Sequence, residues 1–173
     1  MDFAFKPFDI TLRDGRVVHI RPMDSADEVE ILRAFERLSP DARYMRFMRV
    51  VGEPNLERLR KAIASFPESG FAIVATVPRA GGFEIVGSST FVIGSDPATC
   101  EFAVTIADDY SGAGLGRKLL KALIEAARRR GLREIEGFVL KQNIAMVRLA
   151  ARVGFSVSSD PEDPTVRICH LRL

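Results

Sequence analysis

The spacing of hydrophobic residues changes along the chain, and this spacing predicts the order of helices and strands. Two short alternating runs, 8–12 and 17–21, flank Asp14-Gly15, which is a strong signal for a tight hairpin turn. Between residues 25 and 65 the apolar residues instead recur every three or four positions, the period of an amphipathic helix. The chain is therefore expected to begin with a β-hairpin and to continue through a helical region.

Residues that commonly start a helix divide this helical region into three segments. Side chains of Ser, Asp and Asn accept hydrogen bonds from N–H groups of the first turn, and proline fits the first helical position. Such residues occur at three places: Asp24-Ser25, Ser39-Pro40 and Asn55. We therefore expect helices over about 25–38, from residue 39 onward, and from residue 56 to about residue 65.

From Gly70 onward the pattern changes to strands, which then alternate with helices. Three strands are expected first, over 71–77, 83–93 and 99–106, and the turns between them, such as 78–82, predict an antiparallel meander. The remaining elements are expected as helix 115–130, strand 133–140, helix 143–153 and strands 155–158 and 165–173. This order predicts one α/β domain over residues 1–173, with a mixed (α+β) sheet.

The composition supports a globular domain and limits the classes of partner to be expected. Of 173 residues, 47% are hydrophobic and 28% are charged, and the net charge of +2 calls for neither a nucleic acid nor a membrane as partner. Cys100 and Cys169 stand far apart, so we expect neither a disulfide nor a metal site. No apolar run approaches the ~18 residues of a membrane span, and the first residues do not resemble a signal peptide. We therefore expect a cytoplasmic protein.

The stretch from Asp108 to Leu120 combines alternating glycines with the start of an amphipathic helix. Gly112, Gly114 and Gly116 lead into leucines spaced four residues apart. A glycine-rich turn that enters a helix leaves several backbone N–H groups unpaired at the positive end of the helix dipole. We therefore predict that this turn binds a phosphate group.

Two nucleotide-binding motifs fit this stretch poorly. A Walker loop needs Ser or Thr after its lysine to hold magnesium, whereas Gly116 is followed by Arg117-Lys118-Leu119. The dinucleotide fingerprint needs the spacing G-x-G-x-x-G in an early βαβ unit, whereas these glycines alternate and come late in the chain. A purely structural role, in a tight turn and in close helix packing, is the remaining alternative.

The stretch resembles motif A of the GNAT acetyltransferase superfamily, in which a strand, a Gln/Arg-x-x-Gly-x-Gly/Ala turn and a helix bind the pyrophosphate of acetyl-CoA. Gly114 and Gly116 match the two glycines of this motif, and Gly112 is also typical. Ser111 stands where the family usually has Gln or Arg. The resemblance implies a GNAT-like acyl-CoA N-acyltransferase fold, here with an additional N-terminal hairpin strand. It also implies acetyl-CoA as co-substrate, without a metal.

Two further groups of residues extend the resemblance over most of the chain. Asn143, followed by a helix and by Gly154-Phe155, is similar to the second motif of the family. The segments 12–15, 20–22 and 38–47 resemble the acetyltransferase domain of bacterial protein-lysine acetyltransferases, several of which modify acyl-CoA synthetases. This narrower resemblance implies a protein lysine as the acceptor.

The resemblance also implies which residues contact acetyl-CoA: Val104, Thr105, Ile106, Ser111, Gly112, Ala113, Gly114, Leu115, Gly116, Arg117 and Asn143. Main-chain groups of residues 104–106 would bind the pantetheine arm as an added strand, and one N–H there would stabilise the oxyanion. Many members of the superfamily carry a tyrosine seven residues after the asparagine, as the general acid. That position is Ala150 in this chain, so no acid is assigned.

Acetyl transfer to an amine also needs a base, because a lysine amine has a pKa near ~10.4 and is almost fully protonated at neutral pH. Glu101 is the candidate, since it shares a strand face with Ala103 and Thr105, whose small side chains leave room beside the carboxylate. The segment 100–104 also resembles the one that holds the general base in the protein-lysine group. The alternative is a solvated or ion-paired glutamate. Asp108 and Asp109 are poorer candidates, at the end of the strand.

Three functions stay open from the sequence. The first is acetyl-CoA-dependent N-acetyltransfer to a protein lysine, for example of an acyl-CoA synthetase. The second is the same transfer to a small amine, and the third is a non-catalytic acyl-CoA-binding module that senses the cofactor. Arg43, Tyr44 and Arg46 either line the acceptor groove or pack the second helix onto the sheet, with packing slightly favoured.

Overall fold

The computed structural model describes residues 4–66 and 68–173, in which eight strands form one sheet. Across the sheet the strands follow the order β1-β2-β3-β4-β5-β6-β8-β7. Their bounds are Phe8–Thr11 (β1), Val17–Pro22 (β2), Gly70–Arg79 (β3), Gly82–Ile93 (β4), Thr99–Ile106 (β5), Glu134–Leu140 (β6), Ser156–Ser159 (β7) and Val166–Arg172 (β8). The β5–β6 pair is parallel and its neighbouring pairs are antiparallel, which confirms the predicted mixed α/β fold and the antiparallel meander.

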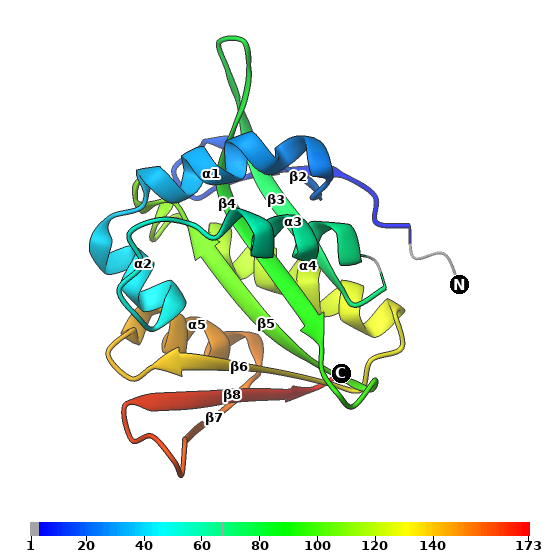
Figure 1. The fold of residues 1–173 in the computed structure, drawn as a ribbon, viewed down its shortest axis with the longest axis vertical. Helices are drawn as coiled ribbons and strands as arrows, with labels where there is room; N and C mark the ends of the chain where they lie inside the picture. The colour runs from blue at the N-terminus through cyan, green and yellow to red at the C-terminus, as the bar shows by residue number, and fades with distance from the viewer. Residues whose placement is uncertain (1–3, 67) are drawn as a thin grey trace.

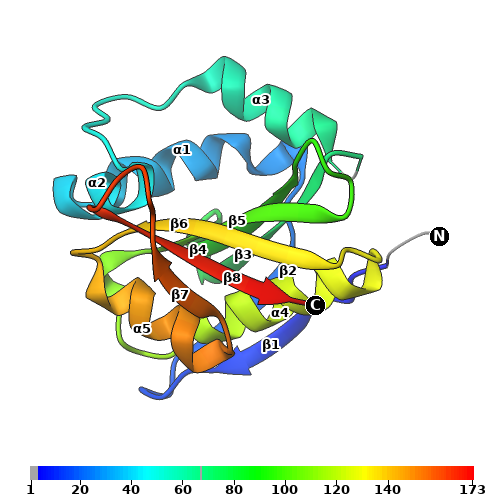
Figure 2. The same cartoon turned by 90° about the horizontal axis from the view of Figure 1, so that it is seen from below.

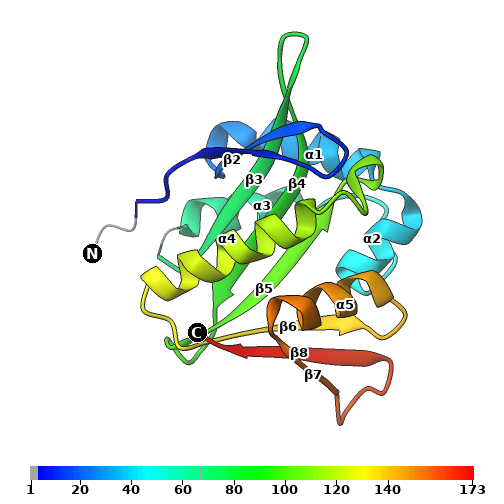
Figure 3. The same ribbon diagram turned by 180° about the vertical axis from the view of Figure 1, so that it is seen from behind.

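Helices cover both faces of this sheet (Figures 1 and 3). One face carries α1 (Glu28–Arg37), α2 (Pro40–Phe47) and α3 (Leu56–Ser65), and the other carries α4 (Leu115–Arg129) and α5 (Ile144–Val153). Figure 2 shows the same arrangement from the edge formed by β7 and β8, with the sheet between the two helical layers. Short 3-10 turns at Ser25–Asp27 and Asp108–Tyr110 precede α1 and the glycine-rich residues 111–116, respectively. Residues 111–116 are called the glycine stretch.

The helix starts predicted from capping residues are confirmed. Each capping side chain accepts a hydrogen bond from a backbone N–H of the first turn, at 2.7 Å for Asp24, 3.1 Å for Ser39 and 2.9 Å for Asn55. Asp24 caps the 3-10 turn that leads into α1, whereas Ser39 and Asn55 cap α2 and α3 directly. These starts were predictable because a cap acts within one helical turn.

The turn expected over 78–82 is too long, and several other predicted bounds differ from the structure by one to three residues. β3 and β4 stay paired as far as Arg79 and Gly82, so that only the residues between them turn. Pro78 fits inside β3 because β2 pairs with β3 only as far as Thr76, and proline is tolerated where no N–H is needed for the ladder.

The main core lies between α4 and the sheet. Four leucines on one side of α4 are completely buried: Leu115, Leu119, Leu120 and Leu123. Burying a leucine side chain contributes roughly 1.5–3 kcal/mol. The helix, and with it the glycine stretch at its N-terminus, is therefore held firmly against the sheet.

β5 and β6 diverge beyond Glu101. β5 pairs with β4 from Cys100 to Ile106, but it pairs with β6 only from Thr99 to Glu101. In Figure 1 the two strands meet at their first residues and separate toward their C-terminal ends. This divergence creates a strand edge in the middle of the sheet.

A close contact marks the place where the strands part. The ring of Phe102 in β5 lies directly against Gly137 of β6, where an added Cβ would come within 2.5 Å of a ring carbon. On its other side the ring packs against Phe155, with 4.9 Å between the ring centroids. Glycine at position 137 therefore makes room for the ring between β5 and β6.

Candidate active site

The glycine stretch between β5 and α4 presents a row of unpaired backbone donors. Gly112 and Gly114 have φ values of 76° and 93°, in the left-handed region that favours glycine, and Gly114 is the N-cap residue of α4. Within the described residues, the N–H groups from Gly112 to Arg117 find no backbone or side-chain acceptor. Consecutive donors of this kind, at the positive end of a helix dipole, form a concavity that suits an anion.

Gly116 has a different role from the other two glycines. It lies in the first turn of α4, where an added Cβ would come within 3.1 Å of the Leu149 side chain and 3.7 Å of the Ile106 side chain. Glycine here allows α4 to approach both α5 and β5. The structural interpretation of the glycines therefore holds for Gly116, whereas Gly112, which faces open space, shapes the loop itself.

The N-terminal hairpin holds the glycine stretch in place. The backbone N–H of Arg13 donates to the carbonyl of Ala113 at 3.1 Å. Nη2 of Arg16 donates to the carbonyl of Asp109 at 2.8 Å, and the guanidinium of Arg16 lies 3.8 Å above the Tyr110 ring. The Asp-Gly signal identified this hairpin in the sequence, but no local signal indicated that its turn contacts the glycine stretch.

Asp108 fixes the other side of the same stretch. Its Oδ2 accepts a hydrogen bond from the N–H of Ser39, the residue that caps α2, at 3.1 Å. This carboxylate therefore joins the end of β5 to the start of α2. The contact gives Asp108 a structural partner, in keeping with its lower rank as a catalytic base.

The edge of β5 that faces β6 carries free main-chain groups beyond the divergence. The N–H of Ala107 donates to the carbonyl of Val86 in β4, and successive residues of a strand direct their main-chain groups to opposite sides. By this alternation Thr105 points its main chain toward β4, whereas Val104 and Ile106 point theirs toward the diverged β6. An extended chain can pair with such an edge as an added strand.

Glu101 lies at the point where the two strands part. Its side chain is exposed and stands on the same side of β5 as Thr105. In the part of the chain that the structure describes, the Glu101 carboxylate forms no hydrogen bond or ion pair. Glu136, its register partner on β6, projects from the same side of the sheet. An unpaired carboxylate at the point where the two strands part is available to accept a proton.

Arg46 of α2 reaches the same side of β5. Its Nε donates to Oγ1 of Thr105 at 2.9 Å, and its charge attracts that of Glu101. Burial lowers the pKa of the Arg46 guanidinium, the Glu101 charge raises it, and the Arg58 charge lowers it again. An arginine nevertheless stays cationic at neutral pH. Arg46 therefore both packs α2 onto the sheet and lies near Glu101, where β5 and β6 part.

Arg43 lies within the helical layer, away from this face. Its guanidinium donates to the carbonyl of Glu36 at 2.9 Å and lies 4.5 Å from the centre of the Phe35 ring. The packing interpretation thus describes Arg43, whereas Arg46 serves both roles and Tyr44 is partly exposed on the outside of α2.

Asn143 begins α5, just after β6. Its Oδ1 accepts a hydrogen bond from the N–H of Met146 at 3.2 Å, so the residue caps the helix, and its amide N–H₂ keeps its donors. Ala150, seven residues after Asn143, is a completely buried residue of α5. No acidic group can therefore reach the opening from that position.

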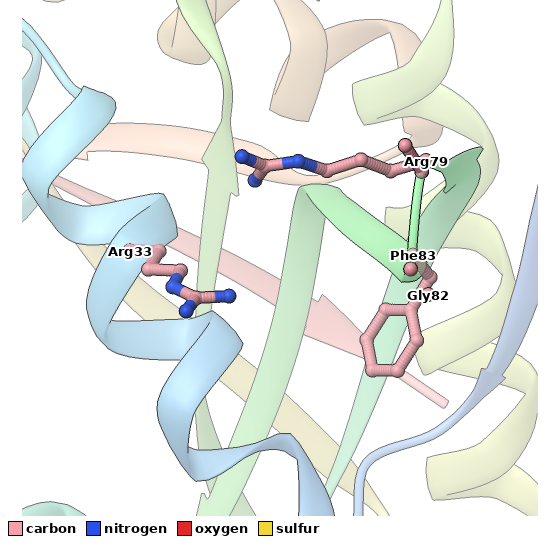
Figure 4. A pocket seen from close by; sticks show the side chains of 6 residues that line it. Arg33, Arg79, Gly82 and Phe83 are labelled. Atoms are coloured by element: carbon pink, nitrogen blue, oxygen red, sulfur yellow. The ribbon is translucent and has the colours of Figure 1, made fainter.

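A separate hollow lies beside the β3–β4 turn (Figure 4). It is lined by Arg33 of α1, Arg79 and residues 80–83. Nη1 of Arg33 also lies 3.8 Å from Oε2 of Glu30, which belongs to the same helix. The hollow shares no residue with the opening between β5 and β6.

The described residues contain two buried free thiols, but no evident metal site and no membrane-spanning helix. They contain no group of three or more His, Cys, Asp and Glu side chains that would hold a metal ion. No helix among them has the length and apolar character needed to cross a membrane. Cys100 and Cys169 are buried free thiols, and burial raises their pKa values to about 12 and about 11.

A comparison with family models identifies this arrangement. Residues 18–156 match the model described as the acetyltransferase (GNAT) domain. The chain belongs to the GNAT acetyltransferase family. An acetyltransferase of Pseudomonas aeruginosa is 37% identical over 163 residues, which are 94% of this chain and 88% of that protein. These findings make the chain an acetyl-CoA-dependent acetyltransferase.

Other GNAT relatives differ in length and in the extent of the match. Acetyltransferase Pat of Mycolicibacterium smegmatis is 30% identical over 149 residues, 86% of this chain but only 44% of the relative. L-methionine sulfoximine/L-methionine sulfone acetyltransferase of Pseudomonas aeruginosa is 43% identical over 60 residues, 35% of each protein. The chain thus spans less than half the length of Pat.

Solved structures share the GNAT fold. The GNAT domain of S. lividans PAT superposes with a TM-score of 0.86 at 22% identity, covering 96% of this chain and 97% of that domain. A Salmonella typhimurium acetyltransferase solved with acetyl-CoA has a TM-score of 0.66 at 24% identity, covering 90% of this chain and 92% of that one. The predicted fold class is therefore confirmed.

Proposed function

We propose that this protein transfers the acetyl group of acetyl-CoA to the ε-amine of a protein lysine, with Glu101 as the general base. The observation that carries the proposal is the position of Glu101, an exposed and unpaired carboxylate at the last residue of β5 that pairs with β6. The free edge of β5 and the donor-rich glycine stretch follow it directly along the chain.

The main chain supplies the binding groups for acetyl-CoA. The N–H groups from Gly112 to Arg117 suit its diphosphate, because they are unpaired and lie at the positive end of α4. The free main-chain groups of Val104 and Ile106 suit the amides of the pantetheine arm. This refines the sequence prediction for Thr105, whose main chain points to β4 and whose side chain contacts Arg46.

The reaction follows from this placement. Glu101 takes a proton from the acceptor ammonium, directly or through water, and the freed amine attacks the thioester carbonyl. A main-chain N–H of Val104 or Ile106 stabilises the oxyanion that develops. The C–N bond forms, the attached nitrogen loses its remaining extra proton to water, the C–S bond breaks, and the electron pair leaves with the CoA sulfur. A thiol has a pKa near ~8.5, so this thiolate leaves without a dedicated acid, consistent with the burial of Ala150.

Two features favour a protein as the acceptor. The Glu101 side chain is exposed, so a lysine on another protein can reach it without a tunnel. The relative named acetyltransferase Pat is 30% identical over 149 residues, which are 86% of this chain. An acyl-CoA synthetase is the acceptor that the N-terminal sequence resemblance favours.

A second candidate acceptor is a small amino acid. It is favoured by the 43% identity over 60 residues to L-methionine sulfoximine/L-methionine sulfone acetyltransferase. The cationic Arg46 beside Glu101 would pair with the carboxylate of such an acceptor.

Labelled acetyl-CoA separates these acceptors. The protein is incubated with labelled acetyl-CoA and either total bacterial protein, purified acyl-CoA synthetases or a panel of amino acids and polyamines. The proposal expects label on protein lysines, read by mass spectrometry of tryptic peptides. Label confined to small amines would favour the second candidate, and CoA binding without any transfer would contradict both.

A further inference from the structure

The N-terminus of α4 gathers positive charge that no acidic side chain balances. The first turn of α4 carries Arg117 and Lys118, both exposed, and contains no acidic residue. Cations at this end of a helix are unfavourable, because they add to the positive end of the dipole. Among the described residues neither side chain is paired with a carboxylate. An anion bound at this place would relieve the repulsion.

Arg13 adds a third cation from a distant part of the sequence. Its backbone is tied to the loop through the carbonyl of Ala113, at 3.1 Å. Its side chain lies across Gly114, with Nε 3.3 Å and Nη2 3.8 Å from the position of a Cβ added there. The guanidinium thus lies beside the unpaired N–H groups of the loop.

The donors of Arg13 are free to bind a ligand. The neighbouring carboxylate of Asp14 is already occupied by Arg16, whose Nη2 and Nε donate to it at 2.6 and 2.9 Å. In the described chain the Arg13 guanidinium has no hydrogen-bond or ion-pair partner, and its side chain is exposed. Ser111, in the loop itself, contributes a hydroxyl but no charge. The hairpin therefore brings to the loop a charge that the loop's own polar side chain does not provide.

We propose that Arg13 is a ligand-binding residue that contacts the diphosphate of acetyl-CoA from the N-terminal hairpin. A guanidinium presents several N–H donors in a plane and matches phosphate oxygens in pairs. The diphosphate is the favoured part of the ligand because the guanidinium lies over Gly114, within the row of donors. The inference rests on the proposed function, since it assigns a further contact in the same acetyl-CoA site.

The test compares Arg13→Gln with the native protein by calorimetric titration of CoA and of dephospho-CoA, which lacks the 3′-phosphate. Loss of one charge-assisted hydrogen bond corresponds to about a tenfold increase in Kd or more. We expect this increase for both ligands. Arg13→Lys keeps the charge without the planar fork, so its Kd should lie between the two. Added salt should weaken CoA binding less in Arg13→Gln than in the native protein.

Two controls separate this contact from indirect effects. Lys121→Gln removes a positive charge from an exposed position further along α4 and should leave Kd within about twofold. The melting temperature of Arg13→Gln should equal that of the native protein, because the side chain forms no bond within the described chain. An unchanged Kd in Arg13→Gln would overturn the proposal, as would a loss seen with CoA but absent with dephospho-CoA. Failure of the native protein to bind CoA would instead overturn the proposed function.

Discussion

Replacing Gly137 with alanine tests whether the Phe102 ring needs the space that glycine leaves where β5 and β6 part. The new Cβ would lie 2.5, 2.7 and 2.8 Å from three carbons of the Phe102 ring, well inside an ordinary contact distance. The ring has little freedom to move away, because its residue is only 5% exposed and it packs against Phe155. Either the ring or β6 must therefore shift.

The size of the effect follows from two opposing contributions. Overpacking of a well-packed core costs about 1–3 kcal/mol, whereas alanine in place of glycine in a strand recovers roughly 0.5–1 kcal/mol. We expect Gly137→Ala to lower the free energy of unfolding by about 1–2 kcal/mol, measured by urea denaturation and circular dichroism. For a chain of this length, each kcal/mol corresponds to a decrease of about 2–4 °C in melting temperature.

A double-variant cycle shows whether Phe102 causes this loss. Phe102→Leu shortens the side chain that meets the new Cβ, so the combined variant should lose about 1 kcal/mol less than the sum of the two single variants. If the losses in free energy of unfolding simply add in the combined variant, or if Gly137→Ala is as stable as the native protein, the Phe102 ring does not oppose the new Cβ.

Three other predictions concern buried charge, thiols and the start of α5. Asp27 is 1% exposed and accepts bonds of 2.6 and 2.8 Å from Arg21, so Asp27→Asn should lower the free energy of unfolding by about 3–5 kcal/mol in urea. Because burial raises the pKa values of Cys100 and Cys169 to about 12 and about 11, both should resist a thiol reagent at pH 8 until denaturant is added. Unfolding exposes both thiols, which then ionise near pH ~8.5, whereas in the folded protein they stay neutral to higher pH. The free energy of unfolding should therefore be unaffected by these thiols below about pH 8.5 and should fall as the pH rises toward 11, which urea titrations at each pH would detect. Asn143→Ala should lose about 1 kcal/mol of stability, whereas Asn143→Asp keeps the cap and tests by calorimetry whether the lost amide donor weakens acetyl-CoA binding.

The helix starts and strand positions were predictable because capping residues and alternating apolar residues act over only a few positions of the chain. Ser39 and Asn55 mark their helices through hydrogen bonds within one turn, and the strand expected over 99–106 has the same bounds as β5. The error at Pro78 has a longer-range cause. Whether a proline interrupts a strand depends on how far the neighbouring strand extends, and β2 ends its pairing before that position.

Contacts between distant segments of the candidate site were not predictable from the sequence. The docking of Arg13 and Arg16 on the glycine stretch joins residues about a hundred positions apart, and no periodic pattern encodes such a contact. The pairing of Glu101 with Glu136 also required the sheet register. By contrast, the glycine stretch itself was predictable from the sequence, because a left-handed turn before a helix requires glycine at particular positions.

The most direct test of the proposed function is the activity of Glu101→Gln, which preserves shape and removes the base. With labelled acetyl-CoA and total bacterial protein, we expect transfer to lysines to fall about 100-fold or more, while the Kd for acetyl-CoA stays within about twofold. Glu136→Gln, the matched control on the neighbouring strand, should retain most of the activity. A Glu101→Gln protein that binds acetyl-CoA and transfers acetyl groups at the native rate would show that Glu101 is not the general base.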